Sequence, residues 1–428
     1  MAKIAPFKAV MYNQAKIADL SRVVCPPYDV ISPRRQDYFH DLDPYNFIQI
    51  ILGKDISAED KYRRAAGLFK GWLKEGVLIQ DEALAIYFYG QHYVLKGEKK
   101  FRLGFISLLH LDNSQNSTVF AHEHTHLGPK EDRLRLLRQV KANLSPIFAV
   151  IPDKKRIIQR IFKDSISAKK PCIDIVDDEK TRHQVWRLDA PAALASITGV
   201  MQNENIFIAD GHHRYEVALT YRDEMRKKSP NFTGEESFNY IPTYFTGAGS
   251  GGLVILPVHR LVKMDAKNNF DNFRIALLEY FEVEEVRDQP RFFFLLEKAG
   301  LNEHILGMYK NKRFWLLRLK NVKILDKIIT DKPKEYRALD VSILNYIVLN
   351  KALGYSSDNQ ENISYGPSAD EFIEQVDSDS SRIAFFLNPV RIQQMMTVAL
   401  SGERMPPKST YFYPKVLSGL VINKHEGY

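Results

Sequence analysis

The chain has 428 residues, of which 45% are hydrophobic and 26% are charged. These ordinary values exclude a disordered, collagen-like or coiled-coil chain, and the length predicts two or three domains. No apolar run approaches the roughly 18 residues of a membrane helix, and the N-terminal MAKIAPFKAV lacks the apolar core of a secretory signal. Cys25 and Cys172 cannot build a disulfide framework, so we expect a cytoplasmic protein with no membrane partner.

The charge balance is basic, because 60 Lys and Arg residues outnumber 52 Asp and Glu residues and give a net charge of +8. Such a balance suits nucleic acid or a phosphorylated small molecule. Positive and negative residues alternate nearly everywhere, whereas nucleic-acid binders gather their positive charges on one face. We therefore expect a small phosphorylated ligand and disfavour nucleic acid as a partner. The sequence carries no signal for an oligomer.

The first hundred residues predict a mixture of helices and strands. Residues 23–30 form an apolar stretch in which Pro26 and Pro27 favour an extended backbone. Apolar side chains at helical spacing and short apolar runs define the other elements. The expected elements are strands at residues 3–12, 83–91 and 101–109 and a helix at residues 58–76.

The middle of the chain alternates short strands with helices. Gly128 and Pro129 are expected to break the chain before a helix whose apolar face includes Leu134 and Leu137. The expected strands are residues 117–121, 146–151, 184–188 and 206–209, and the expected helices are residues 131–144 and a segment after residue 214.

The rest of the chain predicts an α+β region. A loop that contains Pro230 and Gly234 is a candidate domain boundary. We expect strands at residues 240–245 and 253–256, helices near residues 271–281 and 340–353, and three regions at residues 1–99, 100–232 and 233–428. The predicted fold class is mixed α/β, with a central core and flanking α+β N-terminal and C-terminal regions.

Two motif matches lack the structural context that their functions need. Residues 122–126 satisfy H-E-x-x-H, but a zinc protease carries that motif on a helix, and here a strand leads in and Gly128–Pro129 follows. Residues 247–252 satisfy G-x-G-x-x-G, but a β-like run follows them instead of the helix of a dinucleotide-binding fold. We interpret the second match as a hairpin loop.

The loop Asp210-Gly211-His212-His213-Arg214 is more informative, because it lies where a strand meets a helix N-terminus. Free backbone N–H groups and the helix dipole favour an anion there, and an arginine fork can grip phosphate oxygens. A carboxylate beside these donors suits Mg²⁺ held against phosphate. The loop therefore predicts a phosphate site, and the alternative is a solvated turn whose histidines cap the helix.

A second polar loop follows the strand at residues 117–121. Glu123 lies there between His122 and His124, and a carboxylate among histidines can act as a general base. The alternative is a surface salt-bridge cluster. Because ligands collect beyond the carboxyl ends of strands in open α/β sheets, two such loops at one edge favour a shared site.

These segments together resemble two known families. The order of the strand, the His-Glu loop, the helix, SPIFAVI and FIADGHHRYEVAL is similar to the ParB/sulfiredoxin-like nucleotide-binding core, and DGHHR resembles the signature of the free serine kinases with that core. The chain also resembles, over nearly its full length, a bacterial and archaeal family of unknown function. It shares with that family PPYDV, HEHT with K-x-D-R, ADGHHRYE, LPVHR and MPPKSTYFYPK.

The resemblance implies a role for each matching residue. Gly211, His212, His213 and Arg214 would bind the donor phosphates, Asp210 would assist a magnesium ion or the substrate, and Glu123 would deprotonate the hydroxyl of L-serine. We also place Lys130 and Arg133 near the phosphates. Residues expected to border the pocket are His122, Thr125, Tyr28, Asp29, Lys408, Ser409 and Thr410; tight proline-anchored packing is the alternative for the last five. One departure is an insertion at residues 152–203, between the unit that carries Glu123 and the DGHHR loop.

We thus expect a phosphotransferase, with a free L-serine kinase as the leading hypothesis. It would form O-phosphoserine from pyrophosphate or a nucleotide such as ATP or ADP, with Mg²⁺, since phosphoryl transfer needs mainly positioning, charge neutralisation and a base. The alternatives are a ParB-like nucleotide- or DNA-associated binding protein and a phosphoester or nucleotide hydrolase that uses the same loop.

Overall fold

The computed structural model describes residues 1–56, 59–123, 127–229, 231–265, 269–355 and 360–425. The chain divides into two compact units, which we describe separately. The first unit comprises residues 1–121, 125–254 and 414–428, and the second comprises residues 122–124 and 255–413. The fold is mixed α/β, as predicted.

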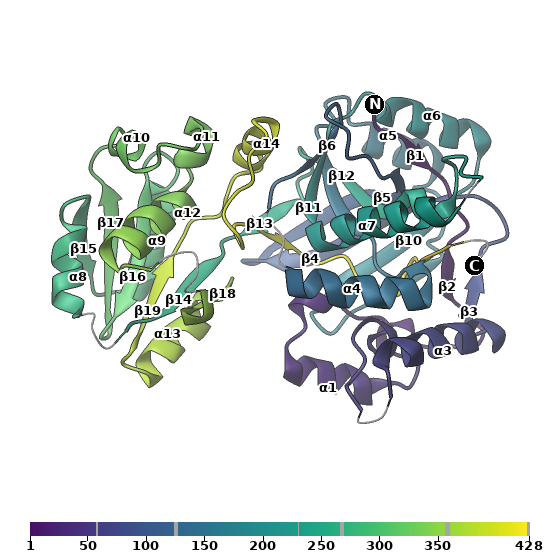
Figure 1. The fold of residues 1–428 in the computed structure, drawn as a ribbon, viewed down its shortest axis with the longest axis horizontal. Coiled ribbons are helices and arrows are strands. Elements are labelled where there is room, and N and C mark those ends of the chain that lie inside the picture. The colour runs from purple at the N-terminus through teal and green to yellow at the C-terminus, as the bar shows by residue number, and fades with distance from the viewer. Residues whose placement is uncertain (57–58, 124–126, 230, 266–268, 356–359, 426–428) are drawn as a thin grey trace. The chain divides into compact units, whose positions relative to one another are not determined.

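The first unit is built on a nine-stranded sheet (Figure 1). Its strands follow the order β6-β11-β8-β12-β5-β4-β10-β9, and β1 pairs with β5. Strands β11 and β6 are parallel, as are β12 and β8, and the other pairs are antiparallel. The strands are β1 (Ile4–Ala5), β4 (Ile86–Leu95), β5 (Glu98–His110), β6 (Val119–Ala121), β8 (Ile147–Ile151), β9 (Ile173–Val176), β10 (Arg182–Leu188), β11 (Ile206–Asp210) and β12 (Tyr240–Gly247).

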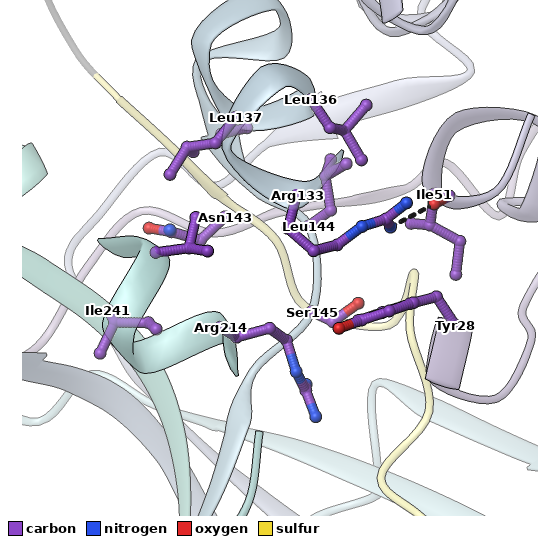
Figure 2. Close-up of a pocket in the computed structure, with 12 residues that line it drawn as sticks. Tyr28, Ile51, Arg133, Leu136, Leu137, Asn143, Leu144, Ser145, Arg214 and Ile241 are labelled. Carbon is purple, nitrogen blue, oxygen red and sulfur yellow. Dashed lines mark hydrogen bonds between the residues drawn. The ribbon is translucent and has the colours of Figure 1, made fainter. Parts of the chain in front are cut away.

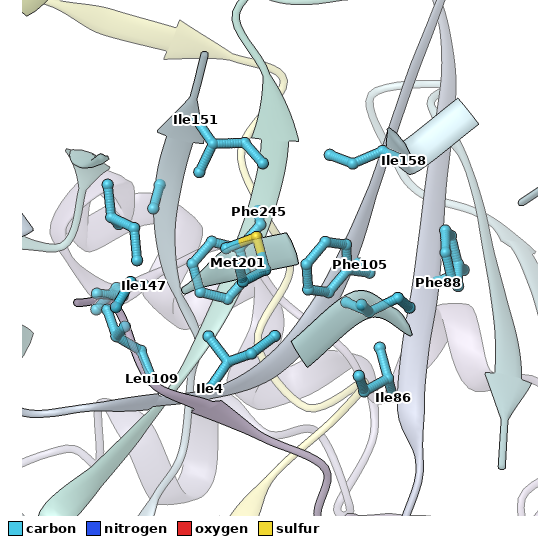
Figure 3. Packing of buried hydrophobic residues seen from close by; sticks show 14 of the residues in the cluster. Ile4, Ile86, Phe88, Phe105, Leu109, Ile147, Ile151, Ile158, Met201 and Phe245 are labelled. Atoms are coloured by element: carbon cyan, nitrogen blue, oxygen red, sulfur yellow. The ribbon is translucent and has the colours of Figure 1, made fainter. Parts of the chain in front are cut away.

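One face of this sheet carries the main apolar core of the unit (Figure 3). Helices α5 (Ile157–Ser165) and α6 (Pro191–Met201) contribute Ile158 and Met201 to this core, which also contains Phe88 and Phe105. Burying each of these side chains stabilises the fold by about 1.5–3 kcal/mol. The insertion expected at residues 152–203 therefore forms part of the core.

The opposite face of the sheet carries buried polar side chains. Gln91 of β4 lies opposite Arg102 of β5 and opposite His183 of β10, and all three are fully buried. The hydroxyl of Tyr89 lies 2.6 Å from Nδ1 of His183, whose Nε2 lies 2.9 Å from Oδ2 of Asp177. These groups satisfy one another, as buried polar groups must.

Three long helices complete the first unit: α3 (Lys61–Lys74), α4 (Leu127–Val140) and α7 (His212–Lys228) (Figure 1). Leu137 of α4 packs with Val217 and Tyr221 of α7. Helix α4 begins before Gly128–Pro129, which corrects the expected chain break there. A proline is tolerated in the first turn of a helix, because its missing N–H would have no partner within the helix.

Shorter elements surround these helices. They are β2 (Val10–Tyr12), β3 (Leu78–Gln80), β7 (Ala142–Asn143), β21 (Asn423–Lys424), α1 (Pro33–Leu42), α2 (Ile48–Ile51) and the 3-10 helices η1 (Leu20–Arg22), η2 (Tyr28–Val30) and η3 (Ser237–Asn239). Strand β2 pairs with β3, and β7 pairs with β21.

The second unit is built on a six-stranded antiparallel sheet in the order β15-β17-β16-β19-β14-β18. Two separate clusters of buried hydrophobic residues pack on it. Its strands are β14 (His259–Lys263), β15 (Phe281–Val286), β16 (Ile305–Lys310), β17 (Arg313–Leu319), β18 (Ile363–Gly366) and β19 (Arg382–Phe386). Strands β13 (Val254–Leu256) and β20 (Tyr411–Tyr413) form a two-stranded sheet.

The helices of the second unit are α8 (Phe270–Leu277), α9 (Gln289–Ala299), α10 (Ile324–Ile328), α11 (Lys334–Arg337), α12 (Asp340–Ile343), the π-helix η4 (Leu344–Ala352), the 3-10 helix η5 (Gln360–Asn362), α13 (Ala369–Ser378) and α14 (Ile392–Leu400). The helix expected at residues 340–353 is therefore a short α-helix that continues as a π-helix.

Two further expectations need correction or restatement. The loop at residues 247–252 is not a hairpin, because β12 and β13 belong to different sheets. No helix follows that loop, which agrees with rejecting a dinucleotide motif. The two units also differ from the three expected regions: β4 and β5, which meet near residue 99, pair along their length within one sheet.

Within the described ranges, no helix is both long and apolar enough to cross a bilayer. Cys25 is buried, Cys172 is partly buried, and both are free thiols.

Candidate functional site

The carboxyl ends of β6 and β11 meet at one edge of the first unit's sheet. The two strands are adjacent and parallel, with Ala121 opposite Ile208. Each of the two strands therefore leads into a polar loop at its carboxyl end. Asp210 is the last residue of β11, and Glu123 follows β6 two residues further along the chain, where it belongs to the second unit.

Gly211 shapes the loop between β11 and α7. Its φ of +92° lies in the left-handed region that favours glycine. A Cβ at this position would lie 2.9 Å from Cγ2 of Ile147 and 3.0 Å from Cζ of Arg214, so no side chain fits. Gly211 is also the N-cap of α7 and has no side chain with which to cap the helix. The first turn of α7 therefore has the backbone N–H groups and dipole of an anion-binding helix terminus.

Asp210 lies between two cations. Its Oδ2 is 3.5 Å from Nη2 of Arg214 and 3.5 Å from Nζ of Lys415. Burial alone would raise the pKa of this carboxyl, but Lys415, Arg214 and His212 outweigh burial and lower the pKa to about 2. Asp210 is therefore ionised at neutral pH, and it holds two positive side chains close together.

Arg214 connects the loop to a neighbouring cavity. Its side chain is 11% exposed, and its Nη1 donates a hydrogen bond to the carbonyl of Pro146. Its Nε is buried and has no hydrogen-bond partner among the described residues. The guanidinium therefore retains a donor for a group that enters the site.

The cavity has a volume of about 60 Å³ and combines apolar walls with a few polar groups (Figure 2). The ring of Tyr28 lies 4.2 Å from Cζ of Arg133, a cation–π contact. Burial, together with the nearby Asp29, raises the pKa of Tyr28 to about 12, so its hydroxyl stays protonated. The lining residues are Tyr28, Ile51, Arg133, Leu136, Leu137, Ala142, Asn143, Leu144, Ser145, Arg214, Val217 and Ile241.

The two cations of α4 that were expected near the phosphates, Lys130 and Arg133, are held by protein groups. Nζ of Lys130 donates to Oε2 of Glu216 at 2.8 Å. Nη1 of Arg133 donates to the carbonyl of Ile51 at 2.6 Å, and its Nε donates to Asp132 at 2.7 Å. Arg133 and Arg214 thus both line the cavity, while Lys130 forms an ion pair with Glu216 of α7.

The second unit holds Glu123 in a cluster of its own. Oε1 of Glu123 accepts a hydrogen bond from the backbone N–H of Lys408 at 2.6 Å, and the carbonyl of Lys408 accepts one from Nη2 of Arg260 at 2.9 Å. Nε2 of His122 lies 3.0 Å from Oγ1 of Thr410. Burial lowers the pKa of Arg260 to about 10. The backbone of Lys408 and the side chain of Thr410 thus contact residues of the same unit.

The other expected site residues are placed as follows. Ser409 is buried, and its hydroxyl donates to the carbonyl of Pro406. Asp29 is exposed in η2, whereas His212 is buried and His213 is partly buried in the first turn of α7. Thr125 and His124 lie outside the described residues.

Sequence reasoning missed Lys415 as a site residue. It closes the MPPKSTYFYPK motif, but the residues chosen from that motif were Lys408, Ser409 and Thr410. The available signal was a lysine directly after Pro414, at the end of a motif that the chain shares with the family of unknown function.

The donor set does not fit a magnesium ion held by the protein. Within the described ranges, no three His, Cys, Asp or Glu side chains gather as a metal site. Oδ2 of Asp210 faces Lys415 and Arg214, whose charges oppose a cation at the same oxygen. We therefore derive no step through magnesium.

The comparisons with known proteins give one family and several distant structures. The model of a family described as "Protein of unknown function (DUF1015)" matches residues 4–342. No curated protein matches the chain.

The solved structures that resemble the chain share about a tenth of its sequence. "Free serine kinase in complex with AMP" has 11% identity and a TM-score of 0.35, covering 69% of this chain and 83% of that chain. "SbnI with C-terminal truncation from Staphylococcus aureus" has 10% identity and a TM-score of 0.38, covering 74% and 86%. A conserved hypothetical protein from Pyrococcus furiosus has 11% identity and a TM-score of 0.34, covering 70% and 89%. At such low identities and TM-scores these structures carry no argument about function, which is inferred from the residues of the site.

Proposed function

The chain belongs to the family described as "Protein of unknown function (DUF1015)", and we propose that it is a phosphotransferase that acts on a small hydroxyl compound. The observation that carries the proposal is the group of donors around Asp210. Gly211 leaves the N-terminus of α7 without a side-chain cap, and Arg214 and Lys415 each approach Oδ2 of the carboxylate to 3.5 Å. Two cations and a helix N-terminus are suited to a phosphate group.

In phosphoryl transfer the protein contributes mainly positioning of the reactants and electrostatic stabilisation. The hydroxyl oxygen of the acceptor attacks the terminal phosphorus of the donor, and the bond from phosphorus to the leaving phosphate oxygen breaks. The hydroxyl proton passes to a base, and the leaving group is inorganic phosphate from pyrophosphate, ADP from ATP or AMP from ADP. Arg214, the first-turn N–H groups of α7 and His212 stabilise the negative charge that moves onto the leaving oxygen.

We propose more specifically that the acceptor is L-serine, that the core is of the ParB/sulfiredoxin type, and that Glu123 is the base. The resemblance of residues 210–214 to the free serine kinase signature supports this assignment. Glu123 is partly buried, its Oε1 accepts a hydrogen bond from the Lys408 N–H, and a carboxylate can act as a general base.

A donor-by-acceptor screen tests the proposal. The full chain is incubated with pyrophosphate, ATP or ADP and with or without L-serine, and phosphoserine, inorganic phosphate, ADP and AMP are measured. With pyrophosphate we expect phosphoserine and inorganic phosphate in equal amounts, and with ATP or ADP we expect phosphoserine with an equal amount of ADP or AMP. In each case the products should form only when serine is present. Phosphate release at the same rate with and without serine would indicate a hydrolase. DNA binding with a steep salt dependence and no turnover would indicate a binding protein. Arg214→Gln should abolish turnover, while Lys8→Gln, an exposed lysine of the first unit, should not change it.

A further inference from the structure

The backbone around Lys415 is held by two fully buried side chains of the sheet. Arg102 donates through Nη2 to the carbonyl of Pro414. Gln91 donates through Nε2 to the carbonyl of Lys415 at 2.9 Å. These carbonyls belong to the C-terminal segment that returns to the first unit at Pro414, more than 300 residues after β5.

Arg102 and Gln91 are themselves fixed. Nε of Arg102 donates to Oε1 of Gln91 at 3.0 Å, and the two residues are direct cross-strand partners. The guanidinium of Arg102 lies 4.7 Å from the ring of Phe148 and 5.5 Å from that of Tyr244. Burying a charged arginine costs free energy unless its N–H groups are hydrogen-bonded. Arg102 is fully buried, and its hydrogen bonds to Gln91 and to the carbonyl of Pro414 fix the position of its guanidinium.

The consequence for Lys415 is a confined ammonium group. Lysine side chains usually sample many rotamers in water, whereas that of Lys415 is only 13% exposed and points its Nζ to within 3.5 Å of Oδ2 of Asp210. Asp210 also holds Arg214 at 3.5 Å. One carboxylate thus faces two cations directly before the N-terminus of α7.

We propose that Lys415 binds phosphate in this site, and that Arg102 and Gln91 are positioning residues that place it there. The inference rests on the proposed function, because it names a further residue of the same site. The side chains around Asp210 do not fit a magnesium ion that could neutralise the charge of a bound phosphate. Lys415 would supply this neutralising positive charge instead. Asp210 then serves to space the two cations for neighbouring phosphate oxygens.

Calorimetric titration of the full chain with inorganic pyrophosphate tests the role of Lys415. We expect Lys415→Met to weaken binding about 10- to 100-fold, the loss typical of a charge-assisted hydrogen bond, and Lys415→Arg to recover most of it. Lys8→Met, at an exposed position, should bind as wild type does. Unchanged binding by Lys415→Met overturns this inference but leaves the proposed function standing. A wild-type chain that binds neither pyrophosphate nor ATP overturns both.

Two double variants separate phosphate binding from a merely structural role. If Lys415 only balanced the charge of Asp210, Lys415→Met would be harmless in an Asp210→Asn background; we expect it to weaken pyrophosphate binding about 10-fold there too. Arg102→Lys should weaken binding a few-fold in the wild-type background and not at all with Lys415→Met. Equal weakening in both backgrounds would show that Arg102 acts through the fold and not through Lys415.

Discussion

Asp210→Asn should destabilise the first unit by an amount that depends on pH. The Asp210 carboxyl has a pKa of about 2 in the folded chain against its ordinary 3.8. At about 1.36 kcal/mol for each pKa unit, the ionised carboxylate stabilises the folded state by about 2 kcal/mol at pH 7. Asparagine keeps the shape of the side chain but cannot neutralise Arg214 and Lys415. We therefore expect a loss of about 2 kcal/mol in the free energy of unfolding at pH 7.

The sign of the pH dependence follows from the lowered pKa. The stabilisation is complete above the unfolded-state pKa near 4 and is lost as the pH falls through the folded-state pKa near 2, with about half gone at pH 3. Because asparagine does not titrate, the difference between wild type and Asp210→Asn should shrink over this range.

Urea unfolding followed by tryptophan fluorescence measures this difference. The chain has three tryptophans, of which Trp72 and Trp186 lie in the first unit and Trp315 in the second. A Trp315→Phe background makes the signal report on the first unit alone. Asp164→Asn, at an exposed position of α5, is the control and should change stability little at any pH. Equal stability of wild type and Asp210→Asn at pH 7, or a difference that persists unchanged to pH 3, would refute the electrostatic account of Asp210.

Three further substitutions test other parts of the account. Gly211→Ala should lower the free energy of unfolding by about 1–3 kcal/mol and weaken pyrophosphate binding, because the new Cβ would lie 2.9 Å from Ile147. Gly128→Ala is the control, since no atom lies within 4 Å of a Cβ at that position. Equal urea midpoints of the two variants would contradict the reasoning. Glu123→Gln should lower serine-dependent turnover at least about 100-fold without changing the pyrophosphate Kd, since its amide oxygen can still accept from Lys408; undiminished turnover removes Glu123 as the base. Burial lowers the pKa of His425 to about 4 in the folded chain. Below about pH 6.5 this histidine is therefore protonated in the unfolded chain but not in the folded chain, so the free energy of unfolding falls toward pH 4. His425→Phe should flatten that fall in urea midpoint, and an unchanged pH profile would exclude His425 as its source.

Local patterns predicted the strand, loop and helix at residues 206–228, because an apolar run, a glycine and a helical repeat follow one another there. The start of α4 was misplaced, since Gly128 and Pro129 signal a break unless they lie in the first turn. Arg102 lies on a correctly predicted strand, yet no local pattern marks it as buried, because its partner Pro414 lies 312 residues away. The role of Lys415 depends on the same long-range contact, and so only the fold could reveal it.

The most direct test of the central claim is a phosphorus NMR time course of the wild-type chain with pyrophosphate, recorded with and without L-serine. The account predicts that pyrophosphate disappears only when serine is present, that phosphoserine and inorganic phosphate grow at equal rates, and that Arg214→Gln abolishes both signals. Pyrophosphate that is untouched in both samples, with ATP equally inert in the same experiment, would contradict the assignment of this loop to phosphoryl transfer.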